Sequence, residues 1–268
     1  MFKHILVAVD FSSAWPLLRQ RLEKLAAWDA ERITLMHVLS SRYPATAEET
    51  HRAHYETRLA ELAGELATPA LTVDAQVRAG EPGAVLAKAA QKLGADLLLL
   101  GCRGHSRWYE FFLGSTALDA ARLAPCPVWL EPIDEDQPSR GLQMMMLATD
   151  GSQSVAGAES LARELAPRFQ RTVAVTATCA SESCEREVND AQQHMESLTA
   201  QINGLETRVL DGDPRYATVA EAKKENADLI VIGKRGRNPI QELLLGSTAE
   251  SIARGARCSV LVVPGKPD

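Results

Sequence analysis

Two stretches of the chain carry the same set of residues that can hold a phosphate group. Each stretch has a Gly-x-x-Gly turn, nine further residues, and then Gly-Ser-Thr. The first set is Gly101, Gly104, Gly114, Ser115 and Thr116, and the second is Gly233, Gly236, Gly246, Ser247 and Thr248. Glycines let backbone N–H groups approach a phosphate closely, and a helix that starts at Ser-Thr adds N–H donors, a positive dipole end and a hydroxyl. The spacing therefore predicts a phosphate-binding cradle in each half of the chain.

Charged side chains accompany both predicted cradles. Asp10 and Asp150 each close an apolar run typical of a buried strand, and parallel sheets bind ligands beyond the carboxyl ends of their strands. A carboxylate there suits a ribose hydroxyl or an adenine amine. Lys234, Arg235 and Arg237 make the second cradle more cationic, although solvated surface charge explains these three equally well. We therefore expect a nucleotide site in each half, with the second as the better binder.

Each of these residues also has a purely structural interpretation. A glycine after a strand is commonly a turn residue with positive φ. Ser247 and Glu250 have the spacing of a helix capping box, and Ser115 with Thr116 would cap a helix in a similar way. The functional interpretation rests on the whole spaced set, which occurs twice at the same places in the predicted topology while the other loops differ.

The chain is a tandem duplication. HILVAVD at residues 4–10 matches MMMLATD at 144–150, and ADLLLLGCRG at 95–104 matches ADLIVIGKRG at 227–236. The first pair is 140 positions apart and the second is 132 apart, so the first copy has about eight extra residues between its second and third predicted strands.

The two copies are joined by a segment of different composition. Residues 134–142 are mostly polar, begin with three acidic residues and contain a proline. We therefore expect one domain at residues 1–133, a linker at 134–142 and a second domain at 143–268, each domain being of ordinary size.

Within each copy, apolar runs alternate with helical patterns. The predicted strands are residues 5–9, 33–39, 71–77, 97–100 and 128–130, with the matched runs 205–210, 229–232 and 260–263 in the second copy. Continuous apolar strands are typical of a sheet covered on both faces. Pro82 and Pro214 suit the first turn of a helix. Alternating βα units of this kind predict a doubly wound parallel α/β sheet in each copy.

At these residues the chain resembles the universal stress protein family, whose nucleotide-binding pattern is G-x2-G-x9-G-[ST]. The two matching stretches are GCRGHSRWYEFFLGS, which starts at Gly101, and GKRGRNPIQELLLGS, which starts at Gly233. The strand ends VAVDFS and LATDGS, and the segments PCPV and RCSV, are also similar to the family. The resemblance implies two tandem Rossmann-like domains of the adenine nucleotide alpha hydrolase type, each a parallel five-stranded sheet with strand order 3-2-1-4-5.

The resemblance also implies a ligand and roles for residues. The ligand would be ATP or a related adenine nucleotide such as AMP, held with Mg²⁺ across strands one and four. Asp10 and Asp150 would contact the nucleoside, and the main chain near Val38 and Thr178 would meet the adenine edge. Family members dimerise through their last strand, so the two domains would form an intramolecular pseudo-dimer, and two chains could assemble further.

The first copy departs from the second around its predicted site. Phe11 stands where the second copy has Gly151, which would tighten the entry beside Asp10. Trp108 and Tyr109 lie in its loop and would either cover a nucleotide or block one. We therefore leave the occupancy of the first site open.

Composition narrows the class of protein. The chain is 46% hydrophobic and 24% charged with a net charge of −6, which disfavours a broad electrostatic surface for nucleic acid or an anionic membrane. Its apolar runs are too short to span a membrane. Five cysteines without a framework spacing fit a reducing cytoplasm. His51 and His54 suggest no third ligand, so we expect no metal site formed by protein side chains alone.

These features predict a cytoplasmic stress-response protein that binds an adenine nucleotide. Its occupancy would reach an unidentified protein partner through the loops at residues 102–113 and 234–245. Two alternatives stay open. A slow ATPase or phosphotransferase would need a general base that the sequence does not identify. A nucleotide-free scaffold would keep the glycines as turns only and would bind a protein partner.

Overall fold

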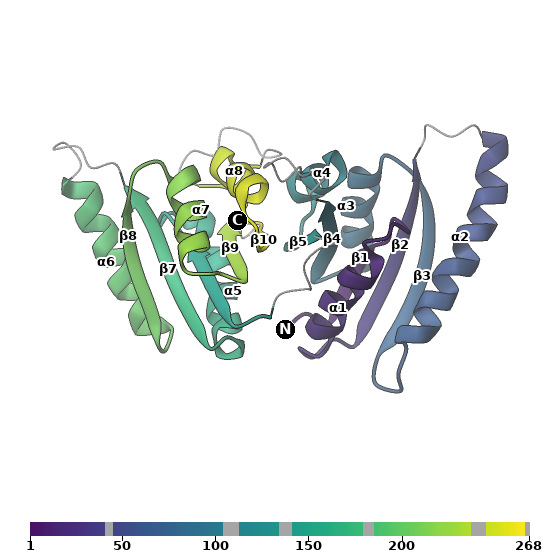
Figure 1. The fold of residues 1–268 in the computed structure, drawn as a ribbon, viewed down its shortest axis with the longest axis horizontal. Helices are drawn as coiled ribbons and strands as arrows, with labels where there is room; N and C mark the ends of the chain where they lie inside the picture. The colour runs from purple at the N-terminus through teal and green to yellow at the C-terminus, as the bar shows by residue number, and fades with distance from the viewer. Residues whose placement is uncertain (41–44, 104–112, 134–140, 179–184, 237–244, 266–268) are drawn as a thin grey trace. The chain divides into compact units, whose positions relative to one another are not determined.

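The fold is described from a computed structural model (Figure 1). The described residues are 1–40, 45–103, 113–133, 141–178, 185–236 and 245–265, and the side chains of 45–50, 103 and 185–187 are left aside. The chain divides into two compact units. Unit 1 denotes the described residues up to 133, and unit 2 denotes those from 141 onward.

Unit 1 is an alternating α/β unit built on one parallel sheet. Its elements are β1 (His4–Ala8), α1 (Trp15–Ala26), β2 (Arg32–Ser40), α2 (Ala45–Leu66), β3 (Thr72–Gly80), α3 (Pro82–Leu93), β4 (Leu97–Arg103), α4 (Ser115–Leu123) and β5 (Val128–Ile133). The strands pair in the order β3-β2-β1-β4-β5. The predicted fold class and the strand order 3-2-1-4-5 are confirmed.

Unit 2 repeats the same plan. Its elements are β6 (Met144–Ala148), η1 (Gln153–Val155), α5 (Ala156–Leu165), η2 (Ala166–Arg168), β7 (Arg171–Thr178), α6 (Glu185–Gln201), β8 (Leu205–Asp211), α7 (Pro214–Lys224), β9 (Leu229–Gly233), α8 (Ser247–Gly255) and β10 (Ser259–Val263). Its strands pair in parallel in the order β8-β7-β6-β9-β10. The strand order reverses between β6 and β9, which is where doubly wound sheets bind ligands.

The sheets hold the apolar cores, and helices cover them on both faces. Every residue of β6 and β9 is buried, as the continuous apolar runs predict. In unit 1 α3 packs beside α4, and in unit 2 α7 packs beside α8. Because parallel crossovers are right-handed, each of these pairs covers one face of its sheet and the two preceding helices cover the other.

Differences in element length explain the spacing between the copies. Helix α2 has 22 residues and its counterpart α6 has 17, which accounts for most of the extra residues in the first copy. Strand β4 continues to Arg103, so Gly101 lies inside the strand, paired with Glu131, and is not a turn residue after it. In unit 2 the strand includes Gly233, one residue beyond the predicted end at 232.

Helix starts follow the predictions with one exception. Pro82 and Pro214 are the first residues of α3 and α7. Helix α8 begins at Ser247, but its N-cap residue is Gly246, which has no side chain to cap with. Glu250 instead pairs with Arg254 one turn later, with N···O distances of 3.1 and 2.9 Å. The capping box expected from Ser247 and Glu250 is therefore wrong, and the Ser247 side chain stays exposed.

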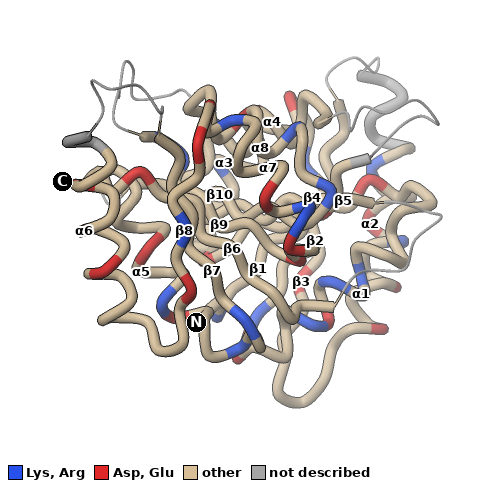
Figure 2. The backbone as a smooth tube through the Cα atoms, turned by 60° about the vertical axis from the view of Figure 1, so that its left-hand side comes forward, with Lys and Arg blue, Asp and Glu red and all other residues tan. Residues whose placement is uncertain are grey.

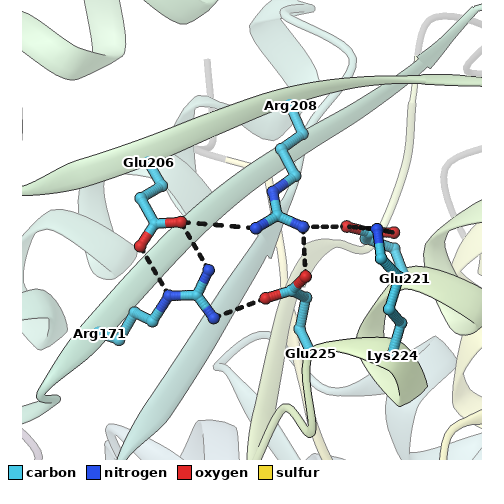
Figure 3. A network of polar contacts seen from close by, with 6 residues as sticks. All are labelled: Arg171, Glu206, Arg208, Glu221, Lys224 and Glu225. Carbon is cyan, nitrogen blue, oxygen red and sulfur yellow. Dashed lines mark hydrogen bonds and ion pairs between the residues drawn. The ribbon is translucent and has the colours of Figure 1, made fainter.

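Charged residues of both signs are spread over the helices and strand ends (Figure 2). The densest ion-pair network lies in unit 2 between β7, β8 and the end of α7 (Figure 3). Arg171 binds Glu206 at 2.6 Å and Glu225 at 2.5 Å, and Arg208 contacts Glu206, Glu221 and Glu225. The network fastens the C-terminal turn of α7 to the edge of the sheet.

Candidate functional site

A cavity of about 260 Å³ opens in unit 2 at the carboxyl ends of β6, β7 and β9. Its size is close to the lower end of the range for small-molecule sites, ~300–1,000 Å³. The residues that line it are Ala148, Thr149, Asp150, Val155, Val175, Thr176, Ala177, Pro214, Thr218, Ile232, Gly233, Arg235, Gly236, Gly246, Ser247, Thr248 and Ala249. The strand ends, the glycine turn and the start of α8 therefore meet around one space.

Most of the residues predicted for the second site line this cavity. They are Asp150, Gly233, Arg235, Gly236, Gly246, Ser247 and Thr248. Lys234 is not among the lining residues and is only 7% exposed. Its backbone N–H donates to Val263 O at 2.6 Å, and its carbonyl accepts from Gly246 N at 2.8 Å. The Lys234 main chain thus holds β10 and the start of α8 in place.

Asp150 is held by a chain of hydroxyl groups. Its Oδ1 accepts from the backbone N–H of Ser152 at 3.0 Å and from the Ser152 hydroxyl at 2.6 Å. The Ser152 and Ser154 hydroxyls are 2.8 Å apart, and Ser154 Oγ donates to Gly236 O at 2.9 Å. Residues at the end of β6 are thereby tied to the glycine turn that follows β9.

Two glycines of this site lie so close to neighbouring residues that a Cβ at either position would force an atom to shift. A Cβ on Gly233 would lie 2.8 Å from Val155 Cγ1, and one on Gly236 would lie 2.7 Å from Asp150 Oδ2. Real Cβ atoms essentially never make contacts that short. These two glycines therefore pack closely against neighbouring residues. Both also line the cavity in which a ligand would lie.

The strand register identifies the counterparts at the ends of β2 and β7. Ala8 pairs with Met36 in unit 1, and Ala148 pairs with Val175 in unit 2. Two residues further along, Val38 therefore corresponds to Ala177.

Thr178 lies one residue beyond this position. Its carbonyl accepts from Gly212 N at 3.0 Å, and it is not among the residues that line the cavity, whereas Ala177 is. The sequence alignment of the two copies slips by one residue here because the segment between the first and second strands is one residue longer in the first copy.

Behind Asp150 lies a polar network that sequence reasoning missed. Thr149 Oγ1 donates to Glu159 Oε1 at 2.5 Å and accepts from Gly151 N at 3.1 Å. His194 Nε2 lies 2.7 Å from the same Glu159 oxygen, and a Cβ on Gly151 would be 3.1 Å from the His194 ring. The sequence feature that could have indicated this network is Glu159, a charged residue on the buried face of α5 beside Ala158 and Ala162.

In unit 1 the same region is aromatic. Phe11 adopts a left-handed backbone with φ 54° where unit 2 has Gly151 with φ 70°. Its ring stacks on Tyr55 at 5.1 Å and lies 5.0 Å from the His37 ring, while the Arg58 guanidinium lies 4.3 Å from the Phe11 centroid. Phe11 is thus fixed by packing against β2 and α2.

The predicted site residues of unit 1 are only partly described. Asp10 Oδ1 accepts from Ser12 N at 3.0 Å, the same turn that Asp150 makes with Ser152. Gly114 is the N-cap residue of α4, which begins with Ser115 and Thr116. Val38 is half-buried in β2. Gly104, Trp108 and Tyr109 lie outside the described residues.

Near the sites, the Cys102 thiol is buried and the His37 imidazole is half-buried. Burial raises the pKa of the Cys102 thiol to about 12, so at neutral pH it is protonated and not a reactive thiolate. Burial also lowers the pKa of His37, whose Nδ1 lies 2.7 Å from Val9 O. Within the described ranges, no group of three or more His, Cys, Asp or Glu side chains could hold a metal ion. Nor does that part of the chain contain a helix with the length and hydropathy needed to cross a membrane.

Sequence comparisons extend the family pattern over most of the chain. The universal stress protein family model matches residues 1–132 and 143–264. Universal stress protein MJ0531 of Methanocaldococcus jannaschii is 44% identical over 59 residues, which are 22% of this chain and 35% of that protein. Universal stress protein Rv2623 of Mycobacterium tuberculosis is 28% identical over 184 residues, or 63% of this chain and 61% of that protein. The chain thus spans between about a third and three fifths of these two relatives.

Longer matches show the same organisation. A universal stress protein of Mycolicibacterium smegmatis is 26% identical over 288 residues, covering 97% of this chain and 96% of that protein. The crystal structure of a universal stress protein from Archaeoglobus fulgidus superposes with a TM-score of 0.82 at 20% identity, covering 99% of this chain and all of the other. That likeness establishes the fold. Because the family model matches both halves, the chain belongs to the universal stress protein family as a tandem two-domain member.

Proposed function

We propose that unit 2 binds an adenine nucleotide, ATP or a relative such as AMP, and that its occupancy regulates a stress response. One observation carries the proposal. Asp150, the turn from Gly233 to Gly236 and the start of α8 line a single cavity at the point where the strand order reverses. Family membership supports a role in stress and leaves the ligand to be argued from the cavity.

The phosphates belong at the β9–α8 side of the cavity. Helix α8 begins at Ser247, so the N–H groups of its first turn have no acceptor inside the helix and face a ligand with the positive end of the dipole. Gly246 gives its own N–H to Lys234 O and leaves the Ser247 hydroxyl exposed beside it. Arg235, which also lines the cavity, adds positive charge.

Mg²⁺ would enter with the phosphates. The described residues offer no ready set of protein ligands, and Mg²⁺ in nucleotide sites commonly keeps several waters and binds phosphate oxygens with one or two carboxylates. The Asp150 carboxylate is the lining residue suited to that part, and it also suits a ribose hydroxyl. The ion would neutralise phosphate charge, while the chain's own groups fix the position of the nucleotide.

Regulation would follow from the position of the two phosphate contacts in the sequence. Gly236 and Ser247 flank residues 237–246, so a nucleotide that engages both would favour some conformations of that segment over others. A protein partner that recognises one of those conformations would read the occupancy of the site. Cys102, Cys126 and Cys258 are thiols and not disulfides, which fits a reducing compartment, and we place this activity in the cytoplasm.

Native mass spectrometry of the full chain during titration with Mg-ATP tests the proposal. We expect a nucleotide mass that is lost in Gly246→Val, because even a Cβ at Gly246 would lie 3.3 Å from Lys234 O and the larger side chain would fill the cradle. Gly141→Val is the matched control, because the three atoms nearest to a Cβ there belong to the Gln143 side chain and are at least 3.6 Å away. Gly114→Val reports on unit 1.

Two further readouts separate the alternatives. Hydrogen exchange of residues 237–244 should slow with Mg-ATP in the wild type and not in Gly246→Val. Phosphate release in the same samples measures any hydrolysis. A wild-type protein that binds no nucleotide at millimolar ATP would overturn the proposal and favour a scaffold.

A further inference from the structure

A buried hydroxyl group opens onto the unit 2 cavity from α7. Thr218 lines the cavity and is only 3% exposed. No hydrogen bond joins its hydroxyl to any of the described residues. Its Oγ1 is not among the fully enclosed polar atoms that lack a partner, so the hydroxyl opens onto the cavity. The hydroxyl is therefore placed to form a hydrogen bond with a ligand in the cavity.

The lining residues of α7 and β7 beside Thr218 are mostly apolar. Val175, Ala177 and Pro214 are apolar, and Thr176 carries the other hydroxyl of this wall. Small-molecule sites combine such apolar walls with a few polar groups that orient the ligand. A flat heteroaromatic ring with a polar edge fits a wall of this composition.

The order of the strands places this wall at the end of the cavity away from the phosphates. Strand β6 lies between β9 and β7, and helix α7 packs on β7. Neighbouring strands are about 4.8 Å apart, so β9 and β7 are separated by about 10 Å. The cradle lies at β9 and α8, Asp150 follows β6, and Thr218 stands beside β7. A nucleotide that lies along this line presents phosphate, sugar and base in that order.

Unit 1 provides an internal comparison. Pro82 and Pro214 are the first residues of the matched helices α3 and α7, and four residues later unit 1 has Leu86 where unit 2 has Thr218. Leu86 is 1% exposed and carries no polar group. The hydroxyl is therefore a feature of unit 2 and not of the shared helix.

We propose that Thr218 is a specificity-determining residue of unit 2, whose hydroxyl donates a hydrogen bond to a ring nitrogen of the bound purine base. This inference rests on the proposed nucleotide binding and deepens it. It assigns base recognition in unit 2 to a side chain of α7, in addition to the main chain at the end of β7.

The test uses isothermal titration of the full chain with Mg-ATP and its 1-deaza, 3-deaza and 7-deaza analogues. The relevant site is the one lost in Gly246→Val. Thr218→Val keeps the shape of the side chain and removes the hydroxyl, and we expect it to weaken ATP binding about 3- to 10-fold. Thr218→Ser should bind within about twofold of the wild type, because it keeps the hydroxyl.

The analogues identify the contact as a base contact. One deaza analogue should lose a similar factor with the wild type, and that loss should disappear in Thr218→Val, as expected of two partners in one hydrogen bond. Unfolding of the unliganded protein adds a readout that separates function from structure. A threonine kept for stability would make Thr218→Val less stable, whereas an unpartnered hydroxyl leaves this variant equally or more stable.

Thr172→Val is the matched control, because Thr172 is 5% exposed on β7 and is not among the lining residues. It should bind ATP like the wild type. Equal ATP affinity of the wild type and Thr218→Val, with no analogue distinguished between them, would overturn the inference while nucleotide binding stands. Failure of the wild type to bind any adenine nucleotide would instead overturn the proposed function.

Discussion

The carboxylate of Asp150 and the α-carbon of Gly236 approach so closely that a Cβ on Gly236 would lie 2.7 Å from Asp150 Oδ2. The two residues come from the ends of β6 and β9, and each accepts from a serine: Ser152 donates to Asp150 Oδ1, and Ser154 donates to Gly236 O. A side chain at the second glycine of the G-x-x-G turn would thus displace a neighbouring carboxylate. This contact therefore joins a glycine of the family pattern to the carboxylate that follows β6.

Gly236→Ala should therefore act through Asp150. The added methyl group would displace the carboxylate, and we expect affinity for Mg-ATP to fall about tenfold or more, the value of a hydrogen bond to a charged group. Calorimetric titration measures the change. Gly64→Ala is the control, because nothing lies within 4 Å of a Cβ at that position in α2. It should leave binding unchanged and stabilise the helix by up to ~1 kcal/mol. Wild-type affinity in Gly236→Ala would show that Asp150 takes no part in binding.

The hydroxyl of Thr149 should contribute to the stability of unit 2. Its hydroxyl donates to Glu159 and accepts from Gly151 N, so Thr149→Val removes a donor from a buried carboxylate and an acceptor from a backbone N–H. We expect a loss of about 1–3 kcal/mol in the free energy of unfolding. Urea denaturation measures it, and Thr149→Ser should recover most of the loss. If valine and serine are equally tolerated, the network does not support the Asp150 loop.

The alternation of strands and helices was predictable because buried parallel strands have continuous apolar sequences. Pro82 and Pro214 also mark two helix starts. The cradle was predictable because its glycines and serine are close in sequence. Side-chain contacts between distant elements were not. Glu159 and His194 meet across 35 residues, and the counterpart of Val38 is Ala177 because the register depends on pairing between strands.

Helix capping and thiol chemistry show the same limit. The spacing of Ser247 and Glu250 permits a capping box, but the helix begins one residue earlier than that box requires, with Gly246 as N-cap. Nothing in the sequence around Cys102 indicates that β4 continues through it and buries its thiol.

Cys102 should resist thiol reagents. Burial raises the pKa of its thiol to about 12, and Cys126 and Cys258 are also buried. In a Cys179→Ser/Cys184→Ser variant, the native protein should react slowly with an aromatic disulfide reagent at mildly alkaline pH, and three thiols should appear on denaturation. A rapid phase in the native variant that Cys102→Ser removes would show that the thiol at the end of β4 is accessible.

The ion pair between Arg171 and Glu225 predicts a specific acid dependence of stability. Hydrogen bonds from Arg208 and Arg171 lower the pKa of Glu225 from 4.5 to about 2. A carboxylate whose pKa is lower in the folded state contributes stability above its unfolded pKa, and the contribution is lost as the pH falls through the folded value. The pair should therefore stabilise unit 2 at neutral pH and stop doing so between about pH 4.5 and about pH 2.

A double-mutant cycle isolates this contribution. Arg171→Leu, Glu225→Gln and the double variant are unfolded with urea at neutral pH and at points down to the folded pKa. We expect a coupling energy that is present at neutral pH, falls across the acid window and weakens in salt, because the Arg171 side chain is 36% exposed. Glu206, whose pKa is also lowered by Arg171, remains in all four proteins and cancels in the cycle. A coupling energy that stays constant down to the lowest pH would show that the contact is not an ion pair with a titrating carboxylate.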